Sequence, residues 1–167
     1  RVLPPVRSPV PRIACGRMFL QVGSELHATD IYTGRHLWKR SLPRFSQFVA
    51  TDLGVYALSA GVCLRINPAT GESLATIPAP PLLEKAGTGW GEICVAGDNL
   101  LGTVGKHLVC VDRTSGELRW QFQAERDGVS FAAGSKTVYC VDYWLPLHRR
   151  RGEPKSEEST IRALDAH

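Results

Sequence analysis

Short apolar runs separated by turn residues make up most of this chain. Between residues 48 and 78 four such runs follow one another, and the residues in them are mainly β-branched, aromatic or aliphatic. The pattern predicts strands over Phe48–Thr51, Gly54–Ser59, Val62–Ile66 and Ser73–Ile77. These residue types suit a pleated, half-buried surface, whereas helical periodicity is weak throughout. A second group predicts strands over Trp90–Val95, Asn99–Thr103, His107–Val111 and Glu117–Phe122.

One sequence motif, which we call the repeated phrase, is complete at residues 28–38 and recurs in partial form at residues 65–75, 110–120 and 163–167. The intervals between copies are 37, 45 and 53 residues, which is typical of repeated supersecondary units with loops of variable length. We therefore expect an all-β fold built from β-propeller blades of four antiparallel strands. About four blades, a partial or half propeller, would form a single domain over residues 1–167.

The repeated phrase predicts a hairpin turn between the last two strands of each blade. An Asp or Asn side chain accepts bonds from nearby backbone N–H groups, a Thr or Ser hydroxyl assists it, and a Gly takes the left-handed conformation. Because the repeat places the carboxylates at equivalent turns, we interpret them as structural rather than catalytic. The expected turn residues are Asp30, Thr33, Gly34, Asn67, Thr70, Gly71, Asp112, Ser115, Gly116 and Asp165.

Two tryptophans end complete or nearly complete copies of the phrase. Trp38 and Trp120 each lie four residues after the turn glycine, so their rings are expected to pack against the turn of the adjacent blade. Ala75 occupies the same place in the second copy, which predicts a weaker contact there.

The pattern Ala-x-Asp-x-x-Thr-Gly-x-x-x-Trp resembles the tryptophan-docking motif of the PQQ-like (quinoprotein) β-propeller repeat, and the resemblance extends over nearly the whole chain. The stretches 16–19, 63–71 and 138–142 are also similar to bacterial PQQ-repeat proteins of unassigned function. The family includes quinone-dependent alcohol and sugar dehydrogenases and a lipoprotein of outer-membrane assembly. It weakly favours an exported or periplasmic location.

For the dehydrogenases the resemblance implies PQQ between a Trp floor and a vicinal Cys-Cys disulfide, a Ca²⁺ ion held by carboxylate and amide oxygens, and an Asp base. This sequence has no adjacent cysteine pair, so no cofactor is evident and PQQ with Ca²⁺ is implied by family resemblance only. The chain accounts for perhaps half of an eight-bladed ring, so the remaining site residues can lie outside it.

Composition narrows the picture further. The net charge of +4 is modest and the basic residues are scattered, which argues against nucleic-acid binding. No apolar stretch is long enough to cross a bilayer. The five cysteines are expected to behave mostly as small buried hydrophobic residues, although the sequence also allows one disulfide. The five histidines show no metal-ligand spacing.

Three segments outside the repeated phrase are candidates for surface function. Trp90 follows a Gly-rich stretch and could place a ring at the propeller mouth or pack in the core. Trp144 precedes a charged insertion at residues 145–159 that contains Arg149, Arg150 and Arg151. Such a run is typical of a solvated loop, and loops on rigid propellers are also where partners bind.

The leading functional hypothesis is a non-catalytic binding or scaffold module that presents loops to a protein partner or neighbouring domain. The alternative is a fragment of a PQQ- and Ca²⁺-dependent oxidoreductase acting on alcohols or sugars. A third hypothesis is control of a catalytic domain in the same polypeptide. Four blades leave two open faces, so further blades of the same polypeptide or a homodimer that closes the ring are expected to cover them.

Overall fold

The computed structural model describes residues 10–81, 89–126, 128–134, 136–143 and 160–165, and all the regular secondary structure in these ranges is β. The first sheet contains β1 (Arg12–Ala14), β2 (Arg17–Val22), β3 (Glu25–Asp30) and β4 (His36–Ser41). The second contains β5 (Gln47–Thr51), β6 (Gly54–Ser59), β7 (Val62–Ile66) and β8 (Ser73–Ile77).

The other two sheets follow in chain order. The third contains β9 (Trp90–Ala96), β10 (Asn99–Val104), β11 (His107–Asp112) and β12 (Leu118–Gln123). The fourth contains β13 (Gly128–Ala133), β14 (Thr137–Tyr143) and β15 (Thr160–Asp165). Within the described ranges no helix is present that is long and apolar enough to cross a membrane.

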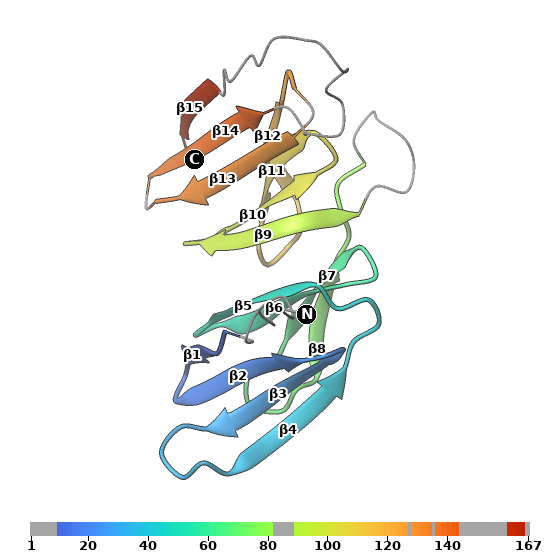
Figure 1. Cartoon of the computed structure of the whole chain (residues 1–167), viewed down its shortest axis with the longest axis vertical. Coiled ribbons are helices and arrows are strands. Elements are labelled where there is room, and N and C mark those ends of the chain that lie inside the picture. The colour runs from blue at the N-terminus through green and yellow to red at the C-terminus, as the bar shows by residue number, and fades with distance from the viewer. Residues whose placement is uncertain (1–9, 82–88, 127, 135, 144–159, 166–167) are drawn as a thin grey trace, which may run out of the picture. The chain divides into compact units, whose positions relative to one another are not determined.

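Each sheet is a meander in which strands pair with their neighbours in sequence, as Figure 1 shows. Four antiparallel sheets of three or four strands are propeller-like blades, so the predicted all-β partial propeller is confirmed. The strands predicted in the second and third copies agree with β5–β8 and β9–β12 to within one or two residues at each end.

Tight hairpins explain why so few residues separate the strands. Cys15 and Gly16 connect β1 to β2 with φ values of 50° and 66°, and Ala60 and Gly61 connect β6 to β7 with 52° and 83°. Two consecutive residues with positive φ match the right-handed twist of the flanking strands. A larger connection is therefore not needed within these blades.

Each sheet has two faces, because side chains alternate along a strand. We call the face that carries Ala28 and its counterparts Arg65, Cys110 and Ala163 the motif face, and the opposite face the reverse face. In the first sheet Phe19 pairs with Ala28, and Ala28 pairs with Trp38, so these side chains share the motif face.

The chain divides into two compact units. The first holds the first sheet and most of the second; the second holds the third and fourth sheets together with Gly61–Cys63 and Ile77. The prediction of a single domain over residues 1–167 stays a prediction.

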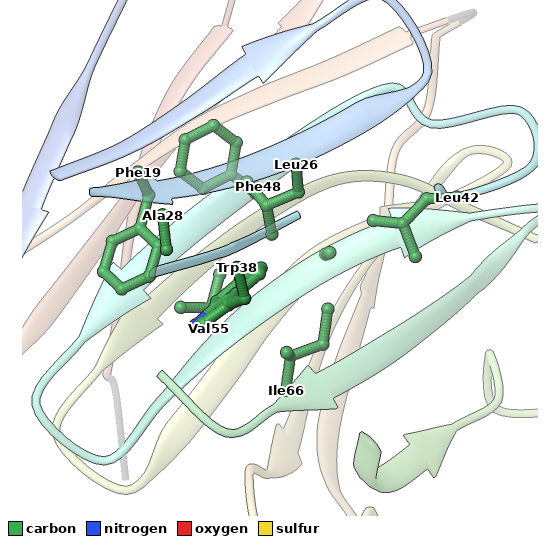
Figure 2. Packing of buried hydrophobic residues seen from close by; sticks show 9 residues of the cluster. Phe19, Leu26, Ala28, Trp38, Leu42, Phe48, Val55 and Ile66 are labelled. Atoms are coloured by element: carbon green, nitrogen blue, oxygen red, sulfur yellow. The ribbon is translucent and has the colours of Figure 1, made fainter. Parts of the chain in front are cut away.

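The core of the first unit lies between the motif face of the first sheet and the reverse face of the second. Figure 2 shows the packed side chains, which come from β2, β3, β4 and Leu42 just after β4 on one side, and from β5, β6 and β7 on the other. The cluster contains Phe19, Leu26, Ala28, Trp38, Leu42, Phe48, Val55, Ala57 and Ile66.

The second unit has its own core, arranged in the same way. The motif face of the third sheet packs on the reverse face of the fourth through Leu101, Leu108, Cys110, Ala124, Val129, Val138 and Cys140. In both units, therefore, a motif face meets the reverse face of the sheet that follows it in the chain.

Candidate functional site

The turn after β3 is held by the Asp30 carboxylate. Its Oδ1 accepts hydrogen bonds from the backbone N–H groups of Tyr32 (3.0 Å) and Thr33 (2.8 Å) and from the Thr33 hydroxyl (2.9 Å). Gly34 has φ of 71° and donates its N–H to the Asp30 carbonyl oxygen at 2.9 Å. These bonds lower the pKa of Asp30, with the Thr33 backbone N–H as the largest cause.

The turn after β7 uses an amide for the same purpose. Asn67 Oδ1 accepts the N–H of Ala69 at 2.8 Å, and Gly71, with φ of 78°, donates to the Asn67 carbonyl oxygen at 2.9 Å. Thr70 does not contact Asn67 through its hydroxyl; it donates to the Glu72 carboxylate at 3.2 Å instead. An uncharged acceptor is thus sufficient for this turn geometry.

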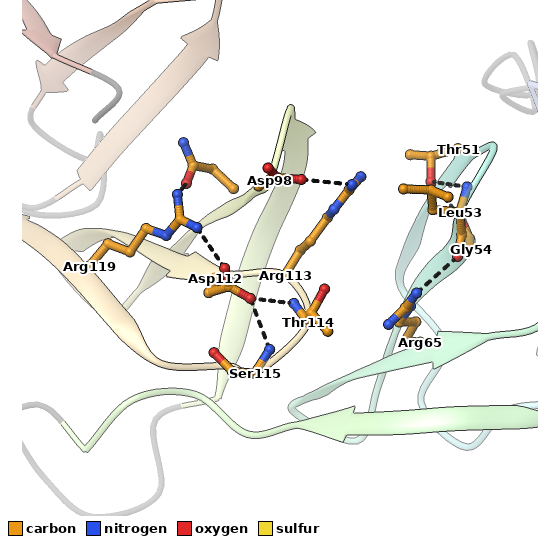
Figure 3. A network of polar contacts seen from close by, with 11 residues as sticks. Thr51, Leu53, Gly54, Arg65, Asp98, Asp112, Arg113, Thr114, Ser115 and Arg119 are labelled. Atoms are coloured by element: carbon orange, nitrogen blue, oxygen red, sulfur yellow. Dashed lines mark hydrogen bonds and ion pairs between the residues drawn. The ribbon is translucent and has the colours of Figure 1, made fainter.

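The turn after β11 is held by a carboxylate with an additional ion pair. Asp112 Oδ1 accepts the N–H groups of Thr114 (2.8 Å) and Ser115 (2.9 Å), and Oδ2 accepts Arg119 Nη2 at 2.6 Å. Figure 3 shows this network. The two backbone donors, followed by Arg119, hold the pKa of the Asp112 carboxyl far below its usual range. Gly116 closes the turn with φ of 77°.

Trp38 reaches the turn after β7. Its indole N–H donates to the Pro68 carbonyl oxygen at 3.1 Å, and the ring lies against Gly71, where an added Cβ would be 2.8 Å from Trp38 Cδ2. Arg40, two residues further along β4, donates to the Gly71 carbonyl oxygen and to Ser73 Oγ, both at 2.8 Å.

The other repeat copies place different side chains at these positions. Ala75 holds the Trp38 position in β8, and Ile77 holds the Arg40 position; Ile77 Cγ2 lies 3.4 Å from where a Cβ on Gly116 would be. Trp120 is half-buried, and its indole N–H is buried with no hydrogen-bond acceptor within the described part of the chain.

Trp90 is not a surface-loop residue. It begins β9, is 5% exposed, and donates its indole N–H to the Ile77 carbonyl oxygen at 3.1 Å. The ring covers Gly102, where an added Cβ would lie 2.7 Å from it. The sequence left two positions open for Trp90, the propeller mouth and the core, and the structure buries its side chain at the start of β9.

The remaining predicted residues contribute less to a described site. Asp165 ends β15 opposite Thr137, is exposed, and borders an open hollow of about 410 Å³ lined by Lys136, Thr137, Ala163, Leu164 and Asp165. Trp144, Arg149, Arg150 and Arg151, together with the insertion at residues 145–159, lie outside the described residues.

Asp142 is a structurally important carboxylate that sequence reasoning missed. It is fully buried in β14 and accepts the backbone N–H groups of Glu125 (2.9 Å) and Arg126 (3.0 Å). Arg126 in turn donates to the Asp142 carbonyl oxygen at 3.1 Å and to Thr160 Oγ1 at 2.9 Å. The available signal was its position two residues after Cys140, on the buried face of an alternating strand.

The described residues do not fit the PQQ and Ca²⁺ site that the family resemblance implies. All five cysteines are free and none is adjacent to another. Burial raises the pKa of Cys63 to about 12 and that of Cys110 to about 11, as expected for unreactive core thiols. The described ranges contain no group of three or more His, Cys, Asp or Glu side chains able to hold a metal.

No protein-family model matches this chain, and no curated protein matches it. Solved structures do match. BamB from Moraxella catarrhalis superimposes with a TM-score of 0.61 at 14% identity, over 78% of this chain and 38% of BamB. The quinohemoprotein alcohol dehydrogenase of Comamonas testosteroni gives 0.57 at 15% identity, over 80% of this chain and 28% of the enzyme.

A second quinohemoprotein alcohol dehydrogenase, ADHIIG from Pseudomonas putida HK5, gives a TM-score of 0.56 at 14% identity, over 78% of this chain and 27% of the enzyme. The chain thus spans well under half the length of each of these structures. At such low identity the similarity shows the fold alone. The chain is a partial β-propeller, structurally similar to PQQ-like propeller proteins such as BamB and the quinohemoprotein alcohol dehydrogenases.

Proposed function

We propose that this chain is a non-catalytic binding or scaffold module, built from PQQ-like propeller repeats, that presents loops to a protein partner or a neighbouring domain. The observation that carries the proposal is that the polar groups of the repeated turns are already engaged. Asp30, Asn67 and Asp112 each accept backbone N–H groups of their own turn. A carboxylate with a lowered pKa and its oxygens engaged is a poor general base near neutral pH.

The tryptophans support the same proposal. Trp38 lies against Gly71 and Trp90 against Gly102, and both indole N–H groups are bonded to backbone carbonyl oxygens. Both rings are buried within the blades, so neither presents a face to a ligand. We therefore assign Trp38 a docking role between the two blades of the first unit.

Structural similarity to two quinohemoprotein alcohol dehydrogenases favours a second candidate, a fragment of a quinone-dependent oxidoreductase. The described cysteines and tryptophans do not fit such a site, so any cofactor residues would have to come from outside them. The test is a quinone absorbance spectrum of the complete native protein after gel filtration. If the protein retains one quinone per chain after gel filtration, the oxidoreductase hypothesis is supported and the scaffold proposal is wrong.

The scaffold role is tested on the charged insertion. Cross-linking mass spectrometry on the native protein identifies the partner, and its affinity is then compared between the wild type and the variant Arg149→Ala/Arg150→Ala/Arg151→Ala. We expect at least a tenfold weaker Kd for this variant. A matched control, Arg12→Ala/Arg35→Ala/Arg44→Ala, removes the same charge from exposed positions of the first unit. Equal affinities of the two variants would refute the role of the insertion in partner binding.

A further inference from the structure

We draw no further inference here: the strongest candidate, the exposed apolar surface patch of Ile31 and Tyr32 in the turn after β3 of the first unit, carries none, because nothing in the described part of the chain shows what covers it.

Discussion

The two compact units hold their sheets together with different side chains at equivalent repeat positions. In the first unit Trp38 and Arg40 of β4 contact the next sheet, where three hydrogen bonds of 2.8 to 3.1 Å join them to the turn after β7 and to the first residue of β8. Phe19 lies beneath the indole, with ring centroids 5.9 Å apart. The Trp38 ring and the Arg40 side chain therefore hold the turn after β7 by direct contact.

In the second unit the corresponding strand, β12, contacts the next sheet without a hydrogen bond from the Trp120 indole to any described residue. Phe122, at the Arg40 position, lies under the Arg162 guanidinium at 5.6 Å, and Arg162 forms an ion pair with Glu125 at 2.7 Å. The connection between the two sheets is held by buried Asp142 through the N–H groups of Glu125 and Arg126.

The difference shows that sheets of the same repeat can be joined by different contacts. A Trp bonded to the next turn and a buried carboxylate bonded to the connecting segment both satisfy backbone groups that would otherwise be unpaired. Each unit should therefore be most sensitive to the loss of its own contact, and less sensitive to a change at the position that the other unit uses.

The largest effect is expected from Trp38→Ala. Truncation removes a buried ring and leaves a cavity over Gly71, so the free energy of unfolding of the first unit should fall by about 4 kcal/mol. Trp120→Ala should cost about half as much, because that ring is half-buried. Urea denaturation followed by circular dichroism measures the unfolding free energy of both variants. Equal decreases would mean that the two rings contribute equally to stability.

Asp142→Ala comes next. It leaves two partly buried backbone N–H groups without an acceptor, which should destabilise the second unit by about 3 kcal/mol. Asp142→Asn keeps one acceptor oxygen and the side-chain shape, so it should cost about 1 kcal/mol. Hydrogen exchange at Glu125 and Arg126 localises the effect; unchanged exchange in Asp142→Ala would contradict the assigned role.

Gly71→Ala tests the contact between the turn and the Trp38 ring. Both Gly71 and Gly34 have positive φ, so an alanine is strained at either by about 1 kcal/mol. Only at Gly71 does the added Cβ meet an indole, at 2.8 Å, whereas nothing lies within 4 Å at Gly34. Gly71→Ala should therefore cost about 1 to 3 kcal/mol more than Gly34→Ala.

The excess should vanish when Gly71→Ala is combined with Trp38→Ala, because the clashing ring is then absent. A double-mutant cycle on unfolding free energies isolates this coupling. If the excess persisted without the ring, its origin would lie in the backbone of the turn rather than in the contact with Trp38.

The fold and its turns were largely accessible from the sequence. The repeated Asp or Asn and Gly positions determine local hydrogen bonds, and local chemistry is what a short motif encodes. Short apolar runs bounded by turn residues likewise predicted the strands of the second and third sheets, because β-branched and aromatic residues suit a pleated surface.

Tertiary partners were less accessible, and Trp90 and Asp142 show why. A Trp beside glycines reads as a loop residue, yet its burial depends on Gly102 and Ile77, which are 12 and 13 positions away in the chain. Asp142 reads as an ordinary polar residue on a strand, because its partners at residues 125 and 126 become neighbours only after folding. The sequence showed that Ala75 stands at the position of Trp38, but not that Ile77 lies beside Gly116.

The smallest effect is the sharpest test of the comparison between the units. Trp38→Phe keeps an aromatic ring but removes the indole N–H that donates to the Pro68 carbonyl oxygen, so it should cost about 1 kcal/mol beyond the change in ring size. Trp120→Phe makes the same change where the buried N–H has no acceptor among the described residues, so the hydrogen-bond cost should be absent and relief of an unpaired donor should offset the smaller ring. Unfolding free energies of the two variants, measured side by side, should therefore differ by about 1 kcal/mol or more, with Trp38→Phe the less stable. If Trp120→Phe lost as much as Trp38→Phe, the Trp120 indole would have an acceptor in solution, and the two units would use the tryptophan in the same way.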